Sequence, residues 1–323
     1  MLKRSLVLSL ALAAVTSTAV LADEDGVSRF ATLPTDAARF PEGIAADAQG
    51  NVYVATFDFE RPNIIYVFGR NGHVQATVPV PGVPLGLAFD SAGNLYVANF
   101  GGGNVLRFSP PFNAGSLPTV LPVTGCPGPF DCGLNALAFD ASGDLYVSDS
   151  FGGRIFKLDL PAGTSSVFVT DELLRPAPAP HGFPPFGANG LAFRGGTLYV
   201  ANTADDRILK VDVATKAVTP FAESINGADG IAFDDKGRLW VAANQGDELV
   251  ALNADGRVVE RLGSFQGIGN DAAPKGLLFP ASIVLSRGHI YVTNLALFLT
   301  PAVGDEPEED VRTYTVSRIR LPN

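Results

Sequence analysis

One phrase recurs six times along the chain, at intervals of 40 to 54 residues. It consists of an opening residue, a small residue, an apolar stretch, a turn that usually contains glycine, and a second apolar stretch with an aromatic residue at its centre. The copies open at Glu42, Leu85, Asn135, Asn189, Asp229 and Ala281. Because a period of this size is typical of repeat architectures, the chain is expected to fold as one array of similar units.

Within a copy, the pattern is that of β-structure alone. In the copy that opens at Asp229, the apolar stretches 231–233 and 239–241 flank a glycine-containing turn, as in a β-hairpin. Two further strands are predicted at 248–252 and 258–262. Four antiparallel strands make a propeller blade, and a blade buries both faces only between neighbouring blades. We therefore predict an all-β fold, a six-bladed β-propeller with four-stranded antiparallel blades.

The two ends of the chain account for the last blade. After the sixth copy only one further strand is predicted, at 313–321, and one strand at 27–33 precedes the first copy. Pairing these two strands would close the last blade with the N-terminal strand and leave no exposed sheet edge. Residues 23–323 are therefore expected to form a single domain, and the 35 glycines and 24 prolines suit its many turns.

The first 22 residues have the pattern of a signal peptide. Lys3 and Arg4 precede an apolar run at 6–21, and Ala22 provides a small residue before an acidic segment. An uncleaved anchor is the alternative, but the polar residues 16–18 dilute the run, and no later segment is long and apolar enough to span a bilayer. The mature protein is therefore expected to be secreted, or periplasmic if the source is a Gram-negative bacterium.

If the protein is exported, its two cysteines are expected to be oxidised. Cys126 and Cys132 lie in one short loop, and an oxidising compartment favours a disulfide between them. A metal-binding pair is the alternative, although no histidine lies nearby in the sequence to complete a zinc site.

The charge of the chain limits its partners. With 23 basic and 33 acidic residues the net charge is −10, which argues against nucleic acid as a partner. No zinc-protease, serine-hydrolase or phosphate-loop motif is present. We expect a monomer that acts on a small molecule. The aromatic residue repeated in each copy is expected to lie in the core between blades, since a ligand platform would not recur in every blade.

The opening residues differ in a way that points to a metal site. The first strand of a blade lines the central channel, so the six opening residues are expected to converge at one of its ends. Four of them carry side-chain oxygens, namely Glu42, Asn135, Asn189 and Asp229. Carboxylate and amide oxygens without thiolate or imidazole suit Ca²⁺, and Mg²⁺ or another divalent cation less readily. The alternative is ordinary turn chemistry, because Asn-Gly and Asp-Gly are common turn dipeptides.

This order of residues resembles a known family. Glu42, Asn135, Asn189-Gly190 and Asp229-Gly230 are similar to the motifs of the senescence-marker-protein, gluconolactonase and luciferin-regenerating-enzyme family, and more distantly to those of diisopropylfluorophosphatase and the paraoxonases. The resemblance covers the mature chain and implies a six-bladed hydrolase of lactones or related esters with a catalytic divalent cation, usually calcium. It implies that Glu42, Asn189 and Asp229 ligate the metal, and that Asn135 ligates it or orients the substrate. Asp229 would also be the general base or nucleophile.

Two departures from the family pattern concern the substrate. The family's first motif has Pro after Glu-Gly, where this chain has Ile44, and Ala188 stands where the family has Pro before Asn-Gly. A non-catalytic propeller of the NHL type, serving as a ligand- or protein-binding module, is the alternative function. The unequal opening residues favour the enzyme, because a purely structural ring has little reason to differ between blades.

Other residues near the same end of the channel are weaker candidates. Polar residues end the second strand of four copies and would either support the metal ligands or cap backbone groups: Asn99, Asp149, Asn202 and Asn294. The insertion at 170–187 is rich in proline and contains His181, a candidate proton shuttle, and Phe186, which would contribute to an apolar substrate wall.

Overall fold

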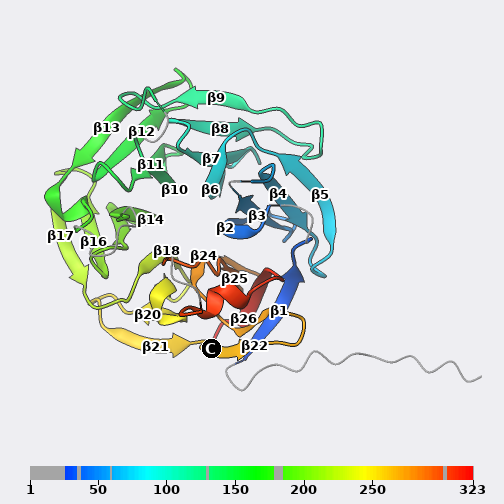
Figure 1. The fold of residues 1–323 in the computed structure, drawn as a ribbon. Coiled ribbons are helices and arrows are strands. Elements are labelled where there is room, and N and C mark those ends of the chain that lie inside the picture. Colours follow the sequence, from blue (N-terminus) through cyan, green and yellow to red (C-terminus); the bar gives the residue numbers. More distant parts are fainter. Residues whose placement is uncertain are drawn as a thin grey trace, which may run out of the picture.

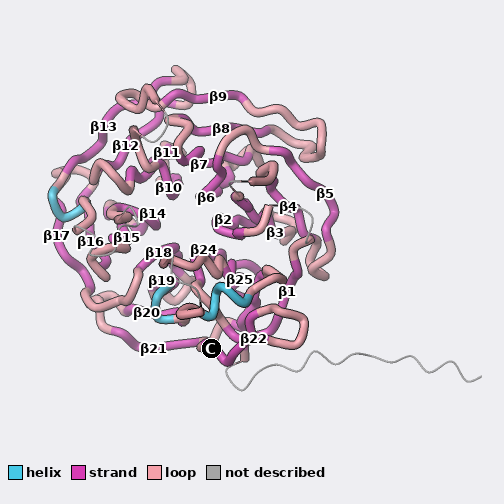
Figure 2. The backbone as a smooth tube through the Cα atoms, viewed as in Figure 1, coloured by secondary structure: helices cyan, strands magenta, loops and turns pink. Residues whose placement is uncertain are grey.

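The computed structural model describes residues 26–34, 38–58, 60–128, 131–177, 185–300 and 304–322. The expected signal peptide and His181 lie outside these residues. The described chain forms six four-stranded antiparallel sheets arranged around a central axis, with one additional two-stranded hairpin (Figure 1). In the ranges just given, helix is confined to three short 3₁₀ turns (Figure 2). The predicted all-β, six-bladed propeller is therefore confirmed.

Each blade runs from an inner strand at the axis to an outer strand at the perimeter. The inner strands are β2 (Phe40–Ala46), β6 (Val83–Phe89), β10 (Leu134–Phe139), β14 (Ala188–Arg194), β18 (Ala228–Phe233) and β24 (Pro280–Ser286). The second strands are β3 (Val52–Phe57), β7 (Leu95–Phe100), β11 (Leu145–Asp149), β15 (Thr197–Asn202), β19 (Leu239–Ala243) and β25 (His289–Asn294). The third strands are β4 (Ile64–Phe68), β8 (Asn104–Phe108), β12 (Arg154–Asp159), β16 (Arg207–Asp212), β20 (Glu248–Leu252) and β26 (Thr315–Arg320). The outer strands are β5 (Val74–Pro79), β9 (Thr119–Pro122), β13 (Thr164–Thr170), β17 (Val218–Ala222), β21 (Val258–Leu262) and β1 (Val27–Thr32).

The ring is closed by the two ends of the described chain. In the sixth blade the strand order is β1-β26-β25-β24, and β1 pairs antiparallel with β26, with Val27 opposite Ile319. The predicted closure of the last blade by the N-terminal strand is confirmed. The additional hairpin, β22 (Phe265–Ile268) with β23 (Pro274–Gly276), lies between the fifth and sixth blades in the sequence.

A repeated hydrogen-bond arrangement explains the aspartate and the aromatic residue of the repeat. In the first blade, Asp47 accepts a hydrogen bond from the backbone N–H of Asn51 at 2.8 Å, and its second oxygen lies 3.3 Å from the hydroxyl of Tyr53. The same pairing recurs in three further blades as Asp90 with Tyr96, Asp140 with Tyr146, and Asp234 with Trp240. The carboxylate thus closes the hairpin turn and satisfies the polar end of a ring that is otherwise buried between blades. The expectation that these rings belong to the core is confirmed.

The inner strands share an irregularity at the opening residue. In every blade the pairing between first and second strands shifts register across the opening residue and the one that follows it, for example between Ala228 and Ile231. A bulge of this kind re-aims side chains that a regular strand would alternate between its two faces. The six opening residues are thereby set apart from the ladder of backbone hydrogen bonds.

Glycines after the opening residues let neighbouring blades approach closely. A Cβ atom at Gly43 would lie 2.0 Å from the carbonyl oxygen of Leu85, and one at Gly190 would lie 2.1 Å from that of Asp229. Four opening residues, Leu85, Asn135, Asp229 and Ala281, are therefore in close backbone contact with the blade before their own. The glycines are required by this proximity around the axis, and this also explains why they recur in the sequence.

We expect Gly190→Ala to lower the melting temperature, with a cost of about 1–3 kcal/mol, because the added methyl group collides with a backbone that is held from both sides. Gly196→Ala, in the turn of the same blade, is the matched control, since nothing lies within 4 Å of its Cβ position. Its stability is expected to be unchanged or slightly raised. Equal melting temperatures for the two variants would contradict the close approach of the blades.

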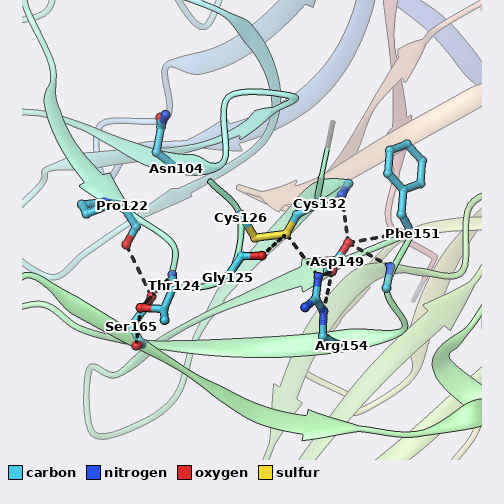
Figure 3. Close-up of a disulfide and its surroundings, with 12 residues drawn as sticks. Asn104, Pro122, Thr124, Gly125, Cys126, Cys132, Asp149, Phe151, Arg154 and Ser165 are labelled. Atoms are coloured by element: carbon cyan, nitrogen blue, oxygen red, sulfur yellow. Dashed lines mark hydrogen bonds and ion pairs between the residues drawn. A yellow bond between two sulfur atoms is a disulfide. The ribbon is translucent and has the colours of Figure 1, made fainter. Parts of the chain in front are cut away.

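Cys126 and Cys132 form a disulfide, with Cα atoms 5.5 Å apart, as expected from the sequence (Figure 3). Around it, Arg154 donates a hydrogen bond to the sulfur of Cys132 at 3.2 Å and forms an ion pair with the buried Asp149. One oxygen of Asp149 accepts hydrogen bonds from three backbone N–H groups, including that of Gly133 at 2.8 Å. The disulfide and this network fix the loop that leads into β10, and hence the position of its opening residue.

Among the helices of the described residues, none is long and apolar enough to cross a membrane.

Candidate functional site

The four polar opening residues are buried at one end of the propeller axis. Glu42, Asn135, Asn189 and Asp229 expose between 4% and 5% of their surface, although no backbone feature requires a polar residue there. The equivalent positions in the second and sixth blades hold Leu85 and Ala281. A polar residue buried in four of six equivalent positions carries a desolvation cost that a structural role does not explain.

The two carboxylates of the ring interact with each other across the axis. Glu42 belongs to the first blade and Asp229 to the fifth, with the sixth blade between them. The charge of Asp229 acts directly on Glu42. The backbone of Glu42 is fixed by a hydrogen bond that its carbonyl oxygen accepts from Thr293 at 2.7 Å. The ring closure therefore brings together two acids that lie almost 190 residues apart in the sequence.

Burial and mutual repulsion set the protonation of this pair. Burial raises the pKa of Glu42 well above its usual range, and the neighbouring Asp229 raises it further. Burial likewise raises the pKa of Asp229 to about 7, although hydrogen bonds from Asn244 and Asn189 act in the opposite direction. Both shifts report the same physical fact, that two negative charges are costly here unless a positive charge accompanies them.

Several buried oxygens of the site have no hydrogen-bond partner in the described part of the chain. They are one oxygen of Glu42 (Oε2), one of Asp229 (Oδ1) and the amide oxygen of Asn244. Buried polar atoms are almost always satisfied, so the two carboxylate oxygens suggest a positive or proton-donating partner, while the amide oxygen of Asn244 lies against Gly227.

The two asparagines are held by a repeated relay. In the third blade, Asn135 Nδ2 donates to the hydroxyl of Ser150 at 3.3 Å, and this hydroxyl donates to the carbonyl of Ala188 at 2.7 Å. In the fourth blade, Asn189 bonds in the same way to Thr203 at 3.0 Å, and Thr203 bonds to the carbonyl of Ala228 at 2.7 Å. Because the nitrogen of each amide is engaged, the carbonyl oxygen is the end that can accept a bond from a bound group.

Asn244 is a member of the site that the sequence analysis missed. Its Nδ2 donates to Asp229 Oδ2 at 3.1 Å, and its side chain is buried. It occupies the position immediately after the second strand, as Ser150 and Thr203 do in their blades. The sequence signal that could have identified Asn244 is that a polar residue follows the second strand in each of these three blades.

The residues at the strand ends themselves serve the fold. Asn99 accepts a hydrogen bond from the backbone of Val83 at 3.0 Å, and Asn294 accepts one from Leu278 at 3.2 Å. Asn202 donates to two backbone carbonyls of the preceding loop at 2.9 Å each. Of the two interpretations that the sequence allowed, these bonds support backbone capping.

The donor set fits a hard cation. Two carboxylates and two amides at the same end of the axis are oxygen ligands of the kind that Ca²⁺ prefers, and the unsatisfied oxygens lie among them. No group of three or more His, Cys, Asp or Glu side chains that could hold a metal occurs in the described ranges, so any cation here would depend on amide oxygens as well. The site offers no thiolate or imidazole of the kind that zinc prefers.

Without metal, stability is expected to fall as the pH rises from 5 to 8. A carboxyl whose pKa is raised on folding stabilises the fold fully below its unfolded value, near 4, and loses this contribution as the pH passes its folded value, about 7 for Asp229. Asp58 and Asp234 have lowered pKa values and lose their contributions only at lower pH, so they do not interfere.

The measurement is the melting temperature of chelator-treated protein across this pH range. Because burial also raises the pKa of Asp247 and Glu308, the part of the slope that belongs to the site is the part removed by Glu42→Gln. An identical slope in this variant would show that Glu42 does not titrate with the fold.

The fold and these buried oxygens place the protein in a class: six-bladed propellers with carboxylate and amide side chains at one end of the axis. Residues 186–264 match the family model described as the SMP-30/gluconolactonase/LRE-like region. The resemblance stated from the sequence is therefore confirmed over a segment that contains both Asn189 and Asp229. No curated protein sequence matches the chain.

Several solved structures share the fold. A luciferin-regenerating enzyme is similar with a TM-score of 0.64 and 16% identity, over 88% of this chain and 92% of that one. A gluconolactonase from Xanthomonas campestris has a TM-score of 0.63 and 16% identity, over 92% and 89%. A virginiamycin B lyase from Staphylococcus aureus has a TM-score of 0.59 and 12% identity, over 92% and 99%. At such identities the likeness shows the fold alone, and proteins of different activity share it.

Proposed function

We propose that this protein is an exported, calcium-dependent hydrolase of the gluconolactonase-like family that cleaves a lactone or a related ester. The observation that carries the proposal is the pair of buried carboxylates, Glu42 and Asp229, each with an oxygen that has no hydrogen-bond partner among the described residues. The match of residues 186–264 to the family model supports the reaction class. A buried pair of carboxylates without a positive charge beside it destabilises a fold. Such a pair is therefore expected where it serves a function.

Glu42, Asn135, Asn189 and Asp229 would hold the cation. When bound, Ca²⁺ supplies Lewis-acid polarisation of the substrate carbonyl oxygen. Mg²⁺ or another divalent cation is a possible substitute, but Mg²⁺ retains its water more strongly and fits a protein-built oxygen site less well.

Asp229 is the residue we assign to proton transfer. Asn244 holds its Oδ2, which leaves Oδ1 to accept a proton from a water. A pKa of about 7 without metal falls when a positive charge is adjacent, so the carboxylate is ionised at neutral pH. The water oxygen then bonds to the carbonyl carbon, the carbon–oxygen bond of the lactone or ester breaks, and the proton passes from Asp229 to the leaving alkoxide.

The chain also allows a covalent version of this step, in which Asp229 itself attacks the carbonyl carbon and water hydrolyses the resulting acyl intermediate. In both versions Asn135 orients the substrate, with its amide fixed by Ser150. Transfer of ¹⁸O from labelled water into Asp229 during a single turnover would establish the covalent route with water attacking the Asp229 carboxyl carbon, whereas direct attack by water places the label only in the product acid.

Export and a small-molecule substrate complete the proposal. The disulfide is consistent with an oxidising compartment, which supports secretion, or a periplasmic location in a Gram-negative source. The acidic net charge of −10 favours a partner other than nucleic acid, and the protein would act as a monomer.

The test is to assay the mature chain on lactones, aryl esters and organophosphates, first after chelation and then with added calcium. We expect hydrolysis that chelation abolishes and calcium restores. Equal activity in the metal-free protein would refute the role of the cation. Saturable calcium binding without hydrolysis of any substrate would instead favour the non-catalytic, ligand-binding propeller.

A further inference from the structure

Three phenylalanine rings from three adjacent blades meet at the end of the propeller that carries the candidate site. Phe100 ends β7 in the second blade, Phe151 follows β11 in the third, and Phe186 precedes β14 in the fourth. The ring centroids lie 5.3 Å apart for Phe100 and Phe151, 5.8 Å for Phe151 and Phe186, and 5.9 Å for Phe100 and Phe186. We call these three residues the aromatic cluster. All three are partly exposed, whereas five of the six rings at the centre of the repeated second strand are buried.

The chain places the aromatic cluster next to the opening residues. Phe100 pairs with Val83, two residues before the opening residue of its blade. The ring of Phe151 packs on Gly133, two residues before Asn135, so closely that a Cβ there would lie 3.0 Å from the ring. Phe186 lies three residues before Asn189. The cluster therefore borders the site on the side of the second, third and fourth blades.

The polar side chains that end the second strands on that side are already used by the fold. Asn99, Asp149 and Asn202 are buried, with exposures of 5%, 0% and 0%. Asp149 accepts from three backbone N–H groups and pairs with Arg154, as Figure 3 shows. Asn99 accepts a hydrogen bond from the backbone of Val83, and Asn202 donates to two backbone carbonyls of the loop before β14. On these three blades the strand ends therefore expose aromatic rings, while their polar groups are occupied.

We infer that the substrate of the proposed hydrolase carries an apolar, preferably aromatic, group beside the reacting carbonyl, and that the aromatic cluster binds this group. The substrate class is thus an aryl-substituted lactone or ester, in contrast to a polyhydroxylated sugar lactone. Partly exposed rings in mutual contact offer apolar area and ring edges to a flat group. Recognition of several hydroxyls requires free donors and acceptors, whereas the strand-end polar groups described on this side are engaged by the backbone. The inference rests on the proposed function for the reacting carbonyl.

Two six-membered lactones test the inference in the calcium-loaded protein, namely dihydrocoumarin, whose ester oxygen is bonded to an aryl ring, and glucono-δ-lactone, which bears hydroxyls and has an aliphatic leaving oxygen. We expect kcat/KM to be at least about tenfold higher for dihydrocoumarin. Phe151→Ala is expected to lower kcat/KM for dihydrocoumarin about tenfold, mainly by raising KM. Its kcat/KM for glucono-δ-lactone is expected to change less than about twofold. Phe151→Leu keeps apolar volume at this position, so its kcat/KM for dihydrocoumarin is expected to lie between the values for wild type and Phe151→Ala.

Phe221→Ala is the matched control. Phe221 lies on the outer strand β17, is also partly exposed, and packs on Tyr199 with centroids 5.1 Å apart. Its loss is expected to leave the ratio of the two kcat/KM values unchanged. A wild-type preference for glucono-δ-lactone, or an equal loss on both substrates in Phe151→Ala, would overturn the inference.

A binding measurement separates this inference from the proposed hydrolysis. Dihydroquinolinone, the lactam analogue of dihydrocoumarin, resists hydrolysis, and its binding to wild type and Phe151→Ala is measured by isothermal titration calorimetry. Binding that Phe151→Ala weakens about tenfold supports the cluster even if no lactone is hydrolysed, in which case only the proposed function fails. Absence of binding to wild type overturns the inference even if lactones are hydrolysed.

Discussion

Asp229→Asn is expected to reduce kcat for the preferred lactone or ester by about 10²–10⁴-fold at saturating calcium. Asparagine has the shape of aspartate but cannot take a proton from water or attack a carbonyl carbon. The fold should persist, because the variant removes one of two charges that repel each other in a buried position. The measurement is a steady-state assay over a calcium titration, so that weaker metal binding is separated from the loss of chemistry.

Asp234→Asn is the matched control for this prediction. Asp234 lies in the turn at the other end of β18 and is bonded to Arg238 at 2.7 Å and to Trp240 at 3.0 Å. Its replacement is expected to lower the melting temperature and to leave kcat nearly unchanged. Full hydrolysis by Asp229→Asn at saturating calcium would show that the proton-transfer assignment is wrong.

Glu42→Gln is expected to have opposite effects with and without metal. In the metal-free protein at pH 8 the melting temperature should rise, because the repulsion with Asp229 and the burial of a charge are both relieved. With calcium, the stabilisation seen in wild type should largely disappear. If the affinity falls about 100-fold, the lost stabilisation is about 2.7 kcal/mol at a calcium concentration well above both dissociation constants.

Asp58→Asn is the matched control for the rise in melting temperature expected of metal-free Glu42→Gln. Asp58 follows the second strand of the first blade, and its buried carboxylate pairs with Arg39 through contacts of 2.7 and 3.0 Å. Removing a charge from such a pair destabilises the fold, so its melting temperature should fall with and without calcium. If Glu42→Gln behaved as Asp58→Asn does, Glu42 would be a structural residue.

The fold was predictable because it follows from local pattern and closure. The hairpin at 231–241 and the strands at 248–252 and 258–262 are visible as alternating apolar stretches, and they agree with β18 to β21. Propeller closure then forces the six opening residues to one end of the axis. That is why Glu42 and Asp229, which are far apart in sequence, could be placed together without coordinates.

The residues that bond to the polar opening residues were harder to predict from the sequence. Successive side chains of a strand point to opposite faces, so at a strand end a shift of one residue decides which one faces the axis. The sequence left Asn202 open between supporting a ligand and capping backbone groups, and the structure shows capping. The residues that hold Asn189 and Asp229 are Thr203 and Asn244, each one place beyond a strand end, and the sequence analysis named neither. The aromatic cluster was only partly visible, through Phe186, because its rings come from three different connections between strands and meet only in the folded ring.

The most direct test of the account is a calcium titration of the chelator-treated protein in which bound metal and lactone or ester hydrolysis are measured at every point. We expect saturation at one calcium ion per chain, with activity rising in proportion to occupancy and with both responses displaced to about 100-fold higher calcium in Glu42→Gln. Activity that is already complete before calcium is added, or the absence of saturable binding, would contradict it.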